Sequence, residues 1–390
     1  MIVDRIILFP YYLCLKIRHA LYDSGLKKIR CAEVPVISIG NVTVGGTGKT
    51  PHTEMVLRTL MSDPLWRGRN LAVLSRGYRR KSRGFQNVTV DGSAAFYGDE
   101  PLQIKKNFPQ VTVAVDRNRI EGCTFLCHPE LLATDRKARK CANKTLPPAD
   151  LIVLDDAFQH RALNAFMNII LVDWNRPVSK DMLLPLGRLR DLPERIEKAD
   201  IIIATKCPAY LENWEKTSWL NGMGISGWDP QTCEGHFSSG RKVKVFFSYI
   251  HYCDLKPVFR EEGDPRYIYS KKMVLFSGIA KDTPLRRFLS DRYQIVRRFR
   301  FSDHHKYNRF DIAHILAAST LNPTAVVATT EKDCQRLLDC KKIPGQLKER
   351  LFQVPIKVAF LSEEEEAVFR ASLSGKLQEF HSGPEPTPRG

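Results

Sequence analysis

A glycine-rich segment that directly follows an apolar, β-branched stretch is the feature that most restricts the fold of this chain. Residues 34–42 predict a strand, and Gly45-Gly46-Thr47-Gly48-Lys49-Thr50 closely follows it and opens a helical stretch. Glycines let a backbone approach phosphate, and successive N–H groups at a helix start form an anion cradle. Strand, loop and helix in this order predict a P-loop α/β domain.

Two side chains at the end of this loop carry the expected chemistry. Lys49 would reach the β- and γ-phosphates of a nucleotide, and the Thr50 hydroxyl would bind Mg²⁺. The strict pattern has Gly five residues before Gly48, where this chain has Thr43. The alternative interpretation is a glycine-rich turn with an incidental Lys-Thr pair, which the flanking strand and helix disfavour.

A second apolar run supplies the acidic partner of such a loop. Residues 151–154 predict a strand that ends in Asp155-Asp156. A strand beside the P-loop strand brings a carboxylate to the Mg²⁺ shell. Because side chains alternate along a strand, only one of the two acids can point at the metal while the strand continues. Taken alone, an Asp at a strand end is more often a helix cap or turn residue.

Short apolar runs that alternate with helical stretches indicate βαβ units, and therefore a mostly parallel sheet with helices on both faces. We predict a three-layer α/β/α sandwich of the P-loop type with a second, smaller α/β domain. The predicted strands are residues 34–42, 71–75, 111–115, 151–156, 169–173 and 200–205, then 242–250, 273–279, 296–301, 325–330 and 356–361, with helices from about 283 and over 309–321. The expected divisions are an N-terminal helical segment 1–32, a kinase-like domain 33–235, a smaller domain 236–375 and a tail 376–390, disordered at its end.

The N-terminal segment has membrane character. Residues 6–15 are apolar apart from the interruption at Pro10, and several Lys and Arg residues follow. This run is shorter than the roughly 20 residues that span a bilayer, and no small-x-small cleavage site of a signal peptide follows. An interfacial helix and an ordinary helix packed on the core both fit the pattern.

The net charge of +17 implies an anionic partner, and nucleic acid, an anionic lipid surface and a phosphorylated substrate all fit. The 10 cysteines are scattered. Cys123, Cys127 and His128 have no second pair at zinc spacing. Without a disulfide framework, a reducing cytosol is the expected compartment.

Three further polar clusters are expected at strand ends, where open α/β sheets bind ligands. They are Ser75-Arg76-Gly77-Tyr78, Gly98-Asp99-Glu100-Pro101 and Asp303-His304-His305. Caps and turns explain such clusters equally well. An acid–imidazole pair is alternatively suited to take a proton from a sugar hydroxyl.

Together these motifs resemble the tetraacyldisaccharide 4′-kinases of lipid A biosynthesis. The resemblance runs in family order from about residue 35 to 335. It is carried by residues 38–51, 75–78, 98–101, Asp116-Arg117, Asp155-Asp156-Ala157-Phe158-Gln159-His160, 184–190, 301–304 and 329–333. The family usually has Gly at the position of Ala157 and Glu at that of Asp191.

The resemblance implies roles for individual residues. Asp99 and His304 would activate the acceptor hydroxyl, and Lys49 would act on the phosphates. The nucleotide would be held by Thr43, Gly45, Gly46, Thr47, Gly48, Lys49, Thr50 and Gln159. The metal would be held by Thr50, Glu100, Asp155 and Asp156, and the lipid substrate by Asn41, Arg76, Tyr78, Arg117 and Arg190.

The same resemblance implies that an ATP- and Mg²⁺-dependent monomer phosphorylates the 4′-hydroxyl of a tetraacyldisaccharide 1-phosphate, giving lipid IVA, at the cytoplasmic face of the bacterial inner membrane. Family members begin with a membrane-contacting amphipathic helix, which favours that interpretation of residues 1–32. Because His304 lies beyond the expected domain boundary, we expect domain closure to bring it to Asp99 and exclude water.

Two other classes are weaker alternatives. A P-loop switch protein of the GTPase kind would continue Thr205-Lys206 with an acid two residues later, where this chain has Pro208. Dimeric ATPase switches carry Lys where this chain has Val44. A nucleic-acid-binding protein is supported by charge alone, without zinc pairs or a basic stripe interleaved with aromatic residues.

Overall fold

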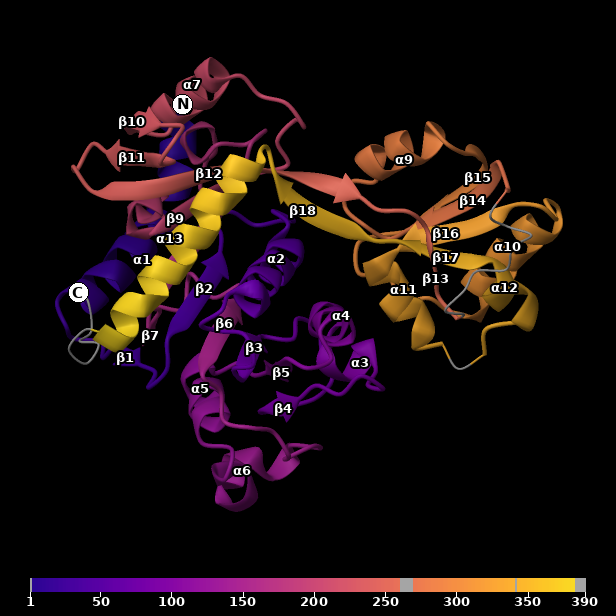
Figure 1. Cartoon of the computed structure of the whole chain (residues 1–390), viewed down its shortest axis with the longest axis horizontal. Coiled ribbons are helices and arrows are strands. Elements are labelled where there is room, and N and C mark those ends of the chain that lie inside the picture. The colour runs from indigo at the N-terminus through magenta and orange to yellow at the C-terminus, as the bar shows by residue number, and fades with distance from the viewer. Residues whose placement is uncertain (1, 260–268, 341, 383–390) are drawn as a thin grey trace.

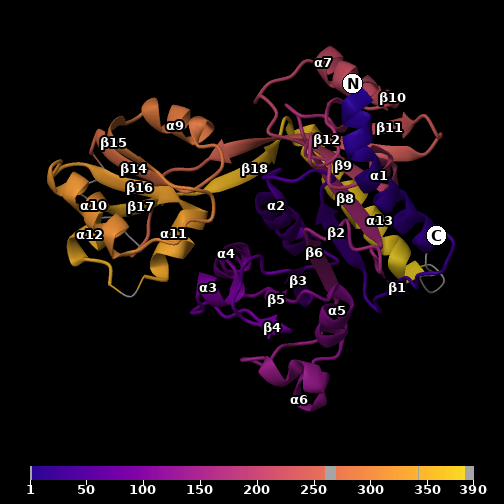
Figure 2. The same cartoon turned by 180° about the vertical axis from the view of Figure 1, so that it is seen from behind.

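Two α/β domains joined by a two-stranded ribbon make up the structure, a computed structural model that describes residues 2–259, 269–340 and 342–382 (Figures 1 and 2). The larger domain contains the N-terminal part of the chain and also its last helix. The smaller domain lies at the far end of the ribbon.

An 11-stranded sheet forms the centre of the larger domain within the described residues. Its middle is parallel, as predicted, and its order is β10-β11-β12-β9-β8-β2-β6-β3-β5-β4 with β18 beside β12. The parallel strands are β2 (Val36–Gly40), β3 (Leu71–Ser75), β5 (Thr112–Val115), β6 (Leu151–Asp155), β8 (Met167–Asp173) and β9 (Ile201–Thr205). Strand β12 (Lys242–Tyr252) is also parallel to β9 over residues 244–247, and it is antiparallel to β11 and β18. The other strands of this sheet are β4 (Gln86–Asn87), β10 (Ile225–Asp229), β11 (Glu234–Phe237) and β18 (Ile356–Phe360). A separate pair joins β1 (Arg30–Cys31) to β7 (Leu163–Asn164).

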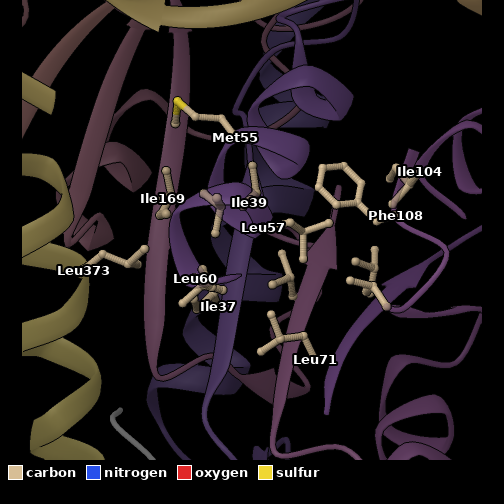
Figure 3. Packing of buried hydrophobic residues seen from close by; sticks show 14 of the residues in the cluster. Ile37, Ile39, Met55, Leu57, Leu60, Leu71, Ile104, Phe108, Ile169 and Leu373 are labelled. Atoms are coloured by element: carbon tan, nitrogen blue, oxygen red, sulfur yellow. The ribbon is translucent and has the colours of Figure 1, made fainter. Parts of the chain in front are cut away.

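Helices cover both faces of this sheet, because the buried strands present apolar side chains to each side. On one face, Ile37 and Ile39 pack against Leu57 and Leu60 of α2 and Leu373 of α13 (Figure 3). This face carries α2 (Lys49–Ser62), α4 (Asp99–Asn107) and α13 (Glu363–Ser382). The other parts of the domain include α1 (Ile2–Asp23), α3 (Ala94–Tyr97), α5 (Arg119–Cys127), α6 (Leu131–Thr134), α7 (Asn213–Asn221) and the 3₁₀ turns Arg136–Lys140, Val178–Lys180 and Pro193–Lys198.

The smaller domain has its own five-stranded sheet, of order β13-β17-β16-β14-β15, among the described residues. Apolar clusters lie on both sides of it, one around Phe276 and Ile315 and one around Leu275 and Leu285. Its strands are β13 (Lys256–Pro257), β14 (Lys272–Ser277), β15 (Gln294–Arg300), β16 (Val326–Thr330) and β17 (Leu351–Val354). Its helices are α9 (Thr283–Ser290), α10 (Arg309–Thr320), α11 (Glu331–Leu338) and α12 (Gly345–Arg350).

The structure divides the chain at a different place from the expected boundary between residues 235 and 236. Strand β12 belongs to the large sheet through residues 244–247, which pair with β9, and it then pairs with β18 over residues 248–252. After β18 the chain re-enters the larger domain, where Phe369, Leu373 and Leu377 of α13 are fully buried. The smaller domain therefore spans roughly β13 to β17, and it is inserted into the larger one. The first part of the tail expected over residues 376–390 continues α13 as far as residue 382, and residues 383–390 lie outside the described residues.

The N-terminal helix α1 is amphipathic and runs along the larger domain (Figure 2). Leu15 and His19 are buried against the domain. Phe9, Leu13 and Ile17, at successive four-residue intervals, are exposed by 58%, 43% and 52%. Within the described residues, the structure contains no helix that is both long and apolar enough to span a bilayer.

Candidate active site

The phosphate-binding loop leaves the carboxyl end of β2 and enters α2, as the sequence predicts. Gly48 caps α2 with φ 85°, a left-handed conformation that favours glycine. Asn41 braces the loop from within, because its amide nitrogen donates to the hydroxyls of Thr43 and Thr47 at 3.3 and 3.0 Å. Gln159 donates to the Asn41 carbonyl at 2.6 Å. Asn41 is 0% exposed, so it supports the loop from below.

The second acid after β6 is neutralised by two cations. Asp156 lies 3.6 Å from Lys49 Nζ and forms an ion pair with Arg190, which also bonds to Asn41. Burial raises the pKa of Asp156, but the Lys49 charge and the Arg190 contact outweigh it and lower the pKa overall. The loop lysine, this acid and Arg190 therefore form one connected charged group beside the P-loop.

The first acid has a different environment. Asp155 is 1% exposed, and its carboxylate oxygens lie 3.5 and 3.3 Å from the hydroxyls of Thr53 and Ser75. Burial, together with the negative charges of Glu100 and Asp156, raises the pKa of Asp155 to about 7. The charges of Lys49 and Arg119 oppose this shift without reversing it, and a buried carboxylate left in such an excess of negative charge is suited to a divalent cation.

The structure distinguishes among the four residues predicted to hold the metal. Asp156 pairs with Lys49 and Arg190, and Glu100 pairs with Lys332. Asp155 has no ion pair among the described side chains, and Thr50 is buried at the start of α2. No three His, Cys, Asp or Glu side chains within the described ranges gather into a metal-binding group. A metal bound to nucleotide phosphates does not need such a group, because Mg²⁺ uses one or two carboxylates and keeps several waters.

The two domains meet at Asp99, the first residue of α4. His304 Nδ1 lies 3.3 Å from the Asp99 carboxylate, and Arg336 of α11 donates to the same oxygen from Nε and Nη2 at 2.9 and 2.6 Å. Asp99 is 8% exposed. Burial raises its pKa, but the His304 hydrogen bond and the charges of Arg336 and Lys332 hold the pKa of Asp99 well below its usual range.

Arg336 is anchored on its own domain as well. It donates to Asp333 at 3.0 Å and to the Gly278 carbonyl at 3.1 Å, and Gly278 N–H and the Thr330 hydroxyl donate to the other Asp333 oxygen. Neighbouring contacts extend the domain interface, since the Asp339 carboxylate accepts from the N–H groups of residues 94 and 95.

The remaining predicted substrate residues occupy different positions. Tyr78 is exposed, with its ring 5.3 Å from the His304 ring. Arg76 and Arg117 are exposed at the ends of β3 and β5. Asn41 and Arg190 are instead engaged with the loop and with Asp156. The structure thus brings Tyr78 to the acid–imidazole pair, whereas Asn41 lies under the loop.

Sequence reasoning missed the cations of α11. Lys332 lies in the motif at residues 329–333, for which no role was predicted, and Arg336 lies one helical turn further along the same face of α11. Asp191, which the resemblance places where the family usually has Glu, lies with its carboxylate 2.6 Å from Nε2 of His19 on α1. The shorter acid is therefore used to hold the N-terminal helix.

Comparison with known proteins gives consistent matches. The tetraacyldisaccharide-1-P 4′-kinase family profile matches residues 5–378. A tetraacyldisaccharide 4′-kinase of Phocaeicola vulgatus is 36% identical over 363 residues, which cover 92% of this chain and 90% of the relative. One of Porphyromonas gingivalis is 34% identical over 376 residues, covering 94% and 95%. The crystal structure of "apo" form LpxK from Aquifex aeolicus in complex with ATP matches with a TM-score of 0.65 and 26% identity, over 96% of this chain and 99% of that one.

Proposed function

The chain belongs to the tetraacyldisaccharide-1-P 4′-kinase family, and on this premise we propose that it transfers the γ-phosphate of ATP to the 4′-hydroxyl of a tetraacyldisaccharide 1-phosphate, giving lipid IVA. The observation that carries the proposal is the contact of Asp99 with His304 across the two domains. This pair is suited to proton abstraction from a hydroxyl, and the phosphate-binding loop lies on the same domain as Asp99.

ATP is the nucleotide, held by the backbone of residues 43–50 and by Lys49. The ATP in the Aquifex aeolicus relative supports this assignment. Mg²⁺ would be held by the nucleotide phosphates with Thr50 and Asp155. It would supply charge neutralisation of the transferring phosphoryl group. Arg190 keeps Asp156 oriented toward Lys49, so that the loop lysine is positioned before the nucleotide arrives.

In the acceptor half of the site, Asp99 stays ionised because Arg336 and His304 contact it. The Asp99–His304 pair takes the proton of the acceptor hydroxyl as that oxygen attacks the γ-phosphorus. Tyr78 lies beside the His304 ring and would contact the sugar, while Arg76 and Arg117 are exposed cations for the anionic part of the lipid.

Domain closure would be the movement that forms the Asp99–His304 contact, and domain opening the movement that breaks it. The ribbon of β12 and β18 is the connection on which the smaller domain would move. His304 and Arg336 would approach and leave Asp99 together. Small-angle scattering with and without Mg²⁺-ATP tests this movement, and identical profiles would contradict it.

The exposed face of α1 would rest on the cytoplasmic surface of the inner membrane, where the lipid acceptor resides. Phe9, Leu13 and Ile17 supply the apolar stripe, and Lys27 and Lys28 supply exposed cations just after the helix. The protein would act there as a monomer.

The assay that tests the proposed reaction uses the full chain, Mg²⁺-[γ-³²P]ATP and a tetraacylated disaccharide 1-phosphate in detergent. We expect labelled bis-phosphorylated lipid from the wild type and not from Lys49→Ala or Asp99→Ala. ATP hydrolysis without labelled lipid would show that the site serves another acceptor or a switch.

A further inference from the structure

A buried histidine one turn into α2 connects the phosphate-binding loop to the root of the interdomain ribbon. His52 is 2% exposed. Its Nδ1 lies 2.7 Å from the Gly48 carbonyl, and its Nε2 lies 2.9 Å from the hydroxyl of Ser248 on β12. No expected role in nucleotide, metal or acceptor binding accounts for this side chain.

The hydrogen-bonding partners define the state of the His52 ring. A carbonyl oxygen only accepts, so Nδ1 carries the proton that is donated to Gly48. Burial is the main reason that the pKa of His52 is lowered to about 4; the Gly48 contact opposes this shift and the nearby Lys206 charge adds to it. The ring is therefore neutral at physiological pH and its Nε2 can only accept, so the single proton of the Ser248 hydroxyl is shared between Nε2 and the Ala204 carbonyl.

Gly48 and Ser248, the two hydrogen-bonding partners of the His52 ring, both lie where the chain passes from one structural element to another. Gly48 is the left-handed residue at which the loop becomes helix α2, and its carbonyl also accepts from the His52 backbone N–H at 3.2 Å. Ser248 is the residue at which β12 stops pairing with β9 and begins pairing with β18. It is 0% exposed, and its hydroxyl also lies 3.0 Å from the Ala204 carbonyl.

We propose that His52 is a positioning residue that holds the phosphate-binding loop in register with the root of the ribbon carrying the smaller domain. The inference rests on the proposed function, in which the loop presents the γ-phosphate and the smaller domain presents His304. A fixed distance between Gly48 and Ser248 aligns the phosphate-binding loop with the smaller domain before the phosphoryl group is transferred. Such alignment of reacting groups contributes to the rate of the chemical step.

The two contacts of the ring can be separated by substitution. His52→Asn places an amide near the position of Nδ1 and nothing at Nε2, so it retains a donor for Gly48 and loses Ser248. Ser248→Ala removes the same contact from the other side. His52→Gln extends an amide toward Ser248. His128→Asn is the matched control, because His128 is a partly exposed histidine whose ring nitrogens bond to the carboxylates of Glu33 and Glu130, and neither acid belongs to the candidate active site.

Steady-state kinetics of the full chain provide the first measurement. We expect His52→Asn and Ser248→Ala each to lower kcat about five-fold, the size of one lost hydrogen bond, with KM for ATP changed less than about two-fold. The double variant should lose no more than either single variant, because both remove one interaction. His52→Gln should recover part of the loss, and His128→Asn should match the wild type.

Amide hydrogen exchange provides a second measurement that requires no lipid. Exchange at residues 45–50 should rise in His52→Asn and in Ser248→Ala and stay at the wild-type level in His128→Asn. Unchanged exchange at the loop, or multiplicative losses of kcat in the double variant, would overturn the inference. Absence of lipid phosphorylation by the wild type would overturn the proposed function and leave the exchange result to decide the role of His52.

Discussion

Arg336 donates two hydrogen bonds to a single carboxylate oxygen of Asp99, although the two residues lie 237 positions apart in the chain. The guanidinium also bonds to Asp333 and to the Gly278 carbonyl, so it is anchored on the smaller domain while it contacts the larger one. His304 Nδ1 lies 3.3 Å from Arg336 Nη2. The smaller domain therefore delivers a fixed cation and an imidazole to the same acid.

The first prediction concerns this cation. Arg336→Gln should lower kcat at least ten-fold and destabilise the protein by about 2–4 kcal/mol, since it removes the guanidinium charge that the buried acids Asp99 and Asp333 share. The pKa of Asp99 is lowered in the folded protein, so its stabilising contribution is present above the ordinary carboxyl pKa and is lost as the pH falls through the folded value. The stability difference between variant and wild type should therefore be largest near neutral pH and shrink in acid.

Urea unfolding at several pH values, combined with the lipid kinase assay, measures both effects. Arg300→Gln is the control, because Arg300 is an exposed arginine on β15 of the same domain. Equal stability of Arg336→Gln and Arg300→Gln at pH 7 would contradict the role given to Arg336.

Replacing either of the adjacent acids Asp155 and Asp156 by the neutral Asn should change the free energy of unfolding, but in opposite directions. The pKa of Asp155 is raised to about 7, so ionising it costs the folded state free energy above pH 7, and this cost is relieved as the pH falls from 7 toward 4. Asp155→Asn should therefore raise the free energy of unfolding at pH 8 by on the order of 2–4 kcal/mol while abolishing transfer.

Asp156→Asn is the matched comparison. The pKa of Asp156 is lowered by Lys49 and Arg190 despite its burial, so its charge stabilises the fold above the ordinary carboxyl pKa. This variant should lower the melting temperature at pH 8. Thermal melts of both variants at pH 5 and pH 8 test the contrast, and a stabilising Asp156→Asn would refute it.

Asn41 provides a third prediction. The residue was expected to contact substrate, but it lies under the loop and donates to Thr43 and Thr47. Asn41→Ala should raise KM for ATP by about three- to ten-fold, corresponding to one or two lost hydrogen bonds, and leave KM for the lipid unchanged. A change confined to KM for the lipid would instead support the original prediction that Asn41 contacts the lipid acceptor.

The exposed stripe of α1 gives a fourth prediction. Phe9→Glu and Ile17→Glu should each weaken binding to anionic vesicles about ten-fold, because each removes an apolar side chain from the lipid interface and adds a negative charge. Leu321→Glu changes a leucine that is 82% exposed at the end of α10 and should have no effect. Vesicle sedimentation measures the three variants, and equal losses in all of them would argue against a specific role for α1.

The local elements were predictable because their signals are local. The runs at residues 71–75 and 151–156 became β3 and β6, with bounds that agree to within one residue. The loop followed β2 directly, as its glycines and Lys49 indicate. Apolar β-branched runs and turn residues act over a few positions, so the sequence shows them plainly.

The domain boundary was not predictable in the same way. Strand β12 continues from one sheet into the ribbon without a change of composition, and its partner β18 comes from residues 356–360. A division at residue 235 followed the polar stretch before β12, which instead forms α7 and the β10–β11 hairpin. The role of Arg336 also depends on a distant partner, which no local pattern displays.

The return of α13 to the larger domain bears on the order in which the chain acquires its structure during synthesis. The main core is incomplete until Phe369, Leu373 and Leu377 have left the ribosome, whereas the inserted domain is finished by about residue 354. The inserted domain is thus able to fold first, while the strands of the larger sheet still expose the apolar face that α13 later covers. Newly made chains should therefore need protection from aggregation until α13 has been synthesised.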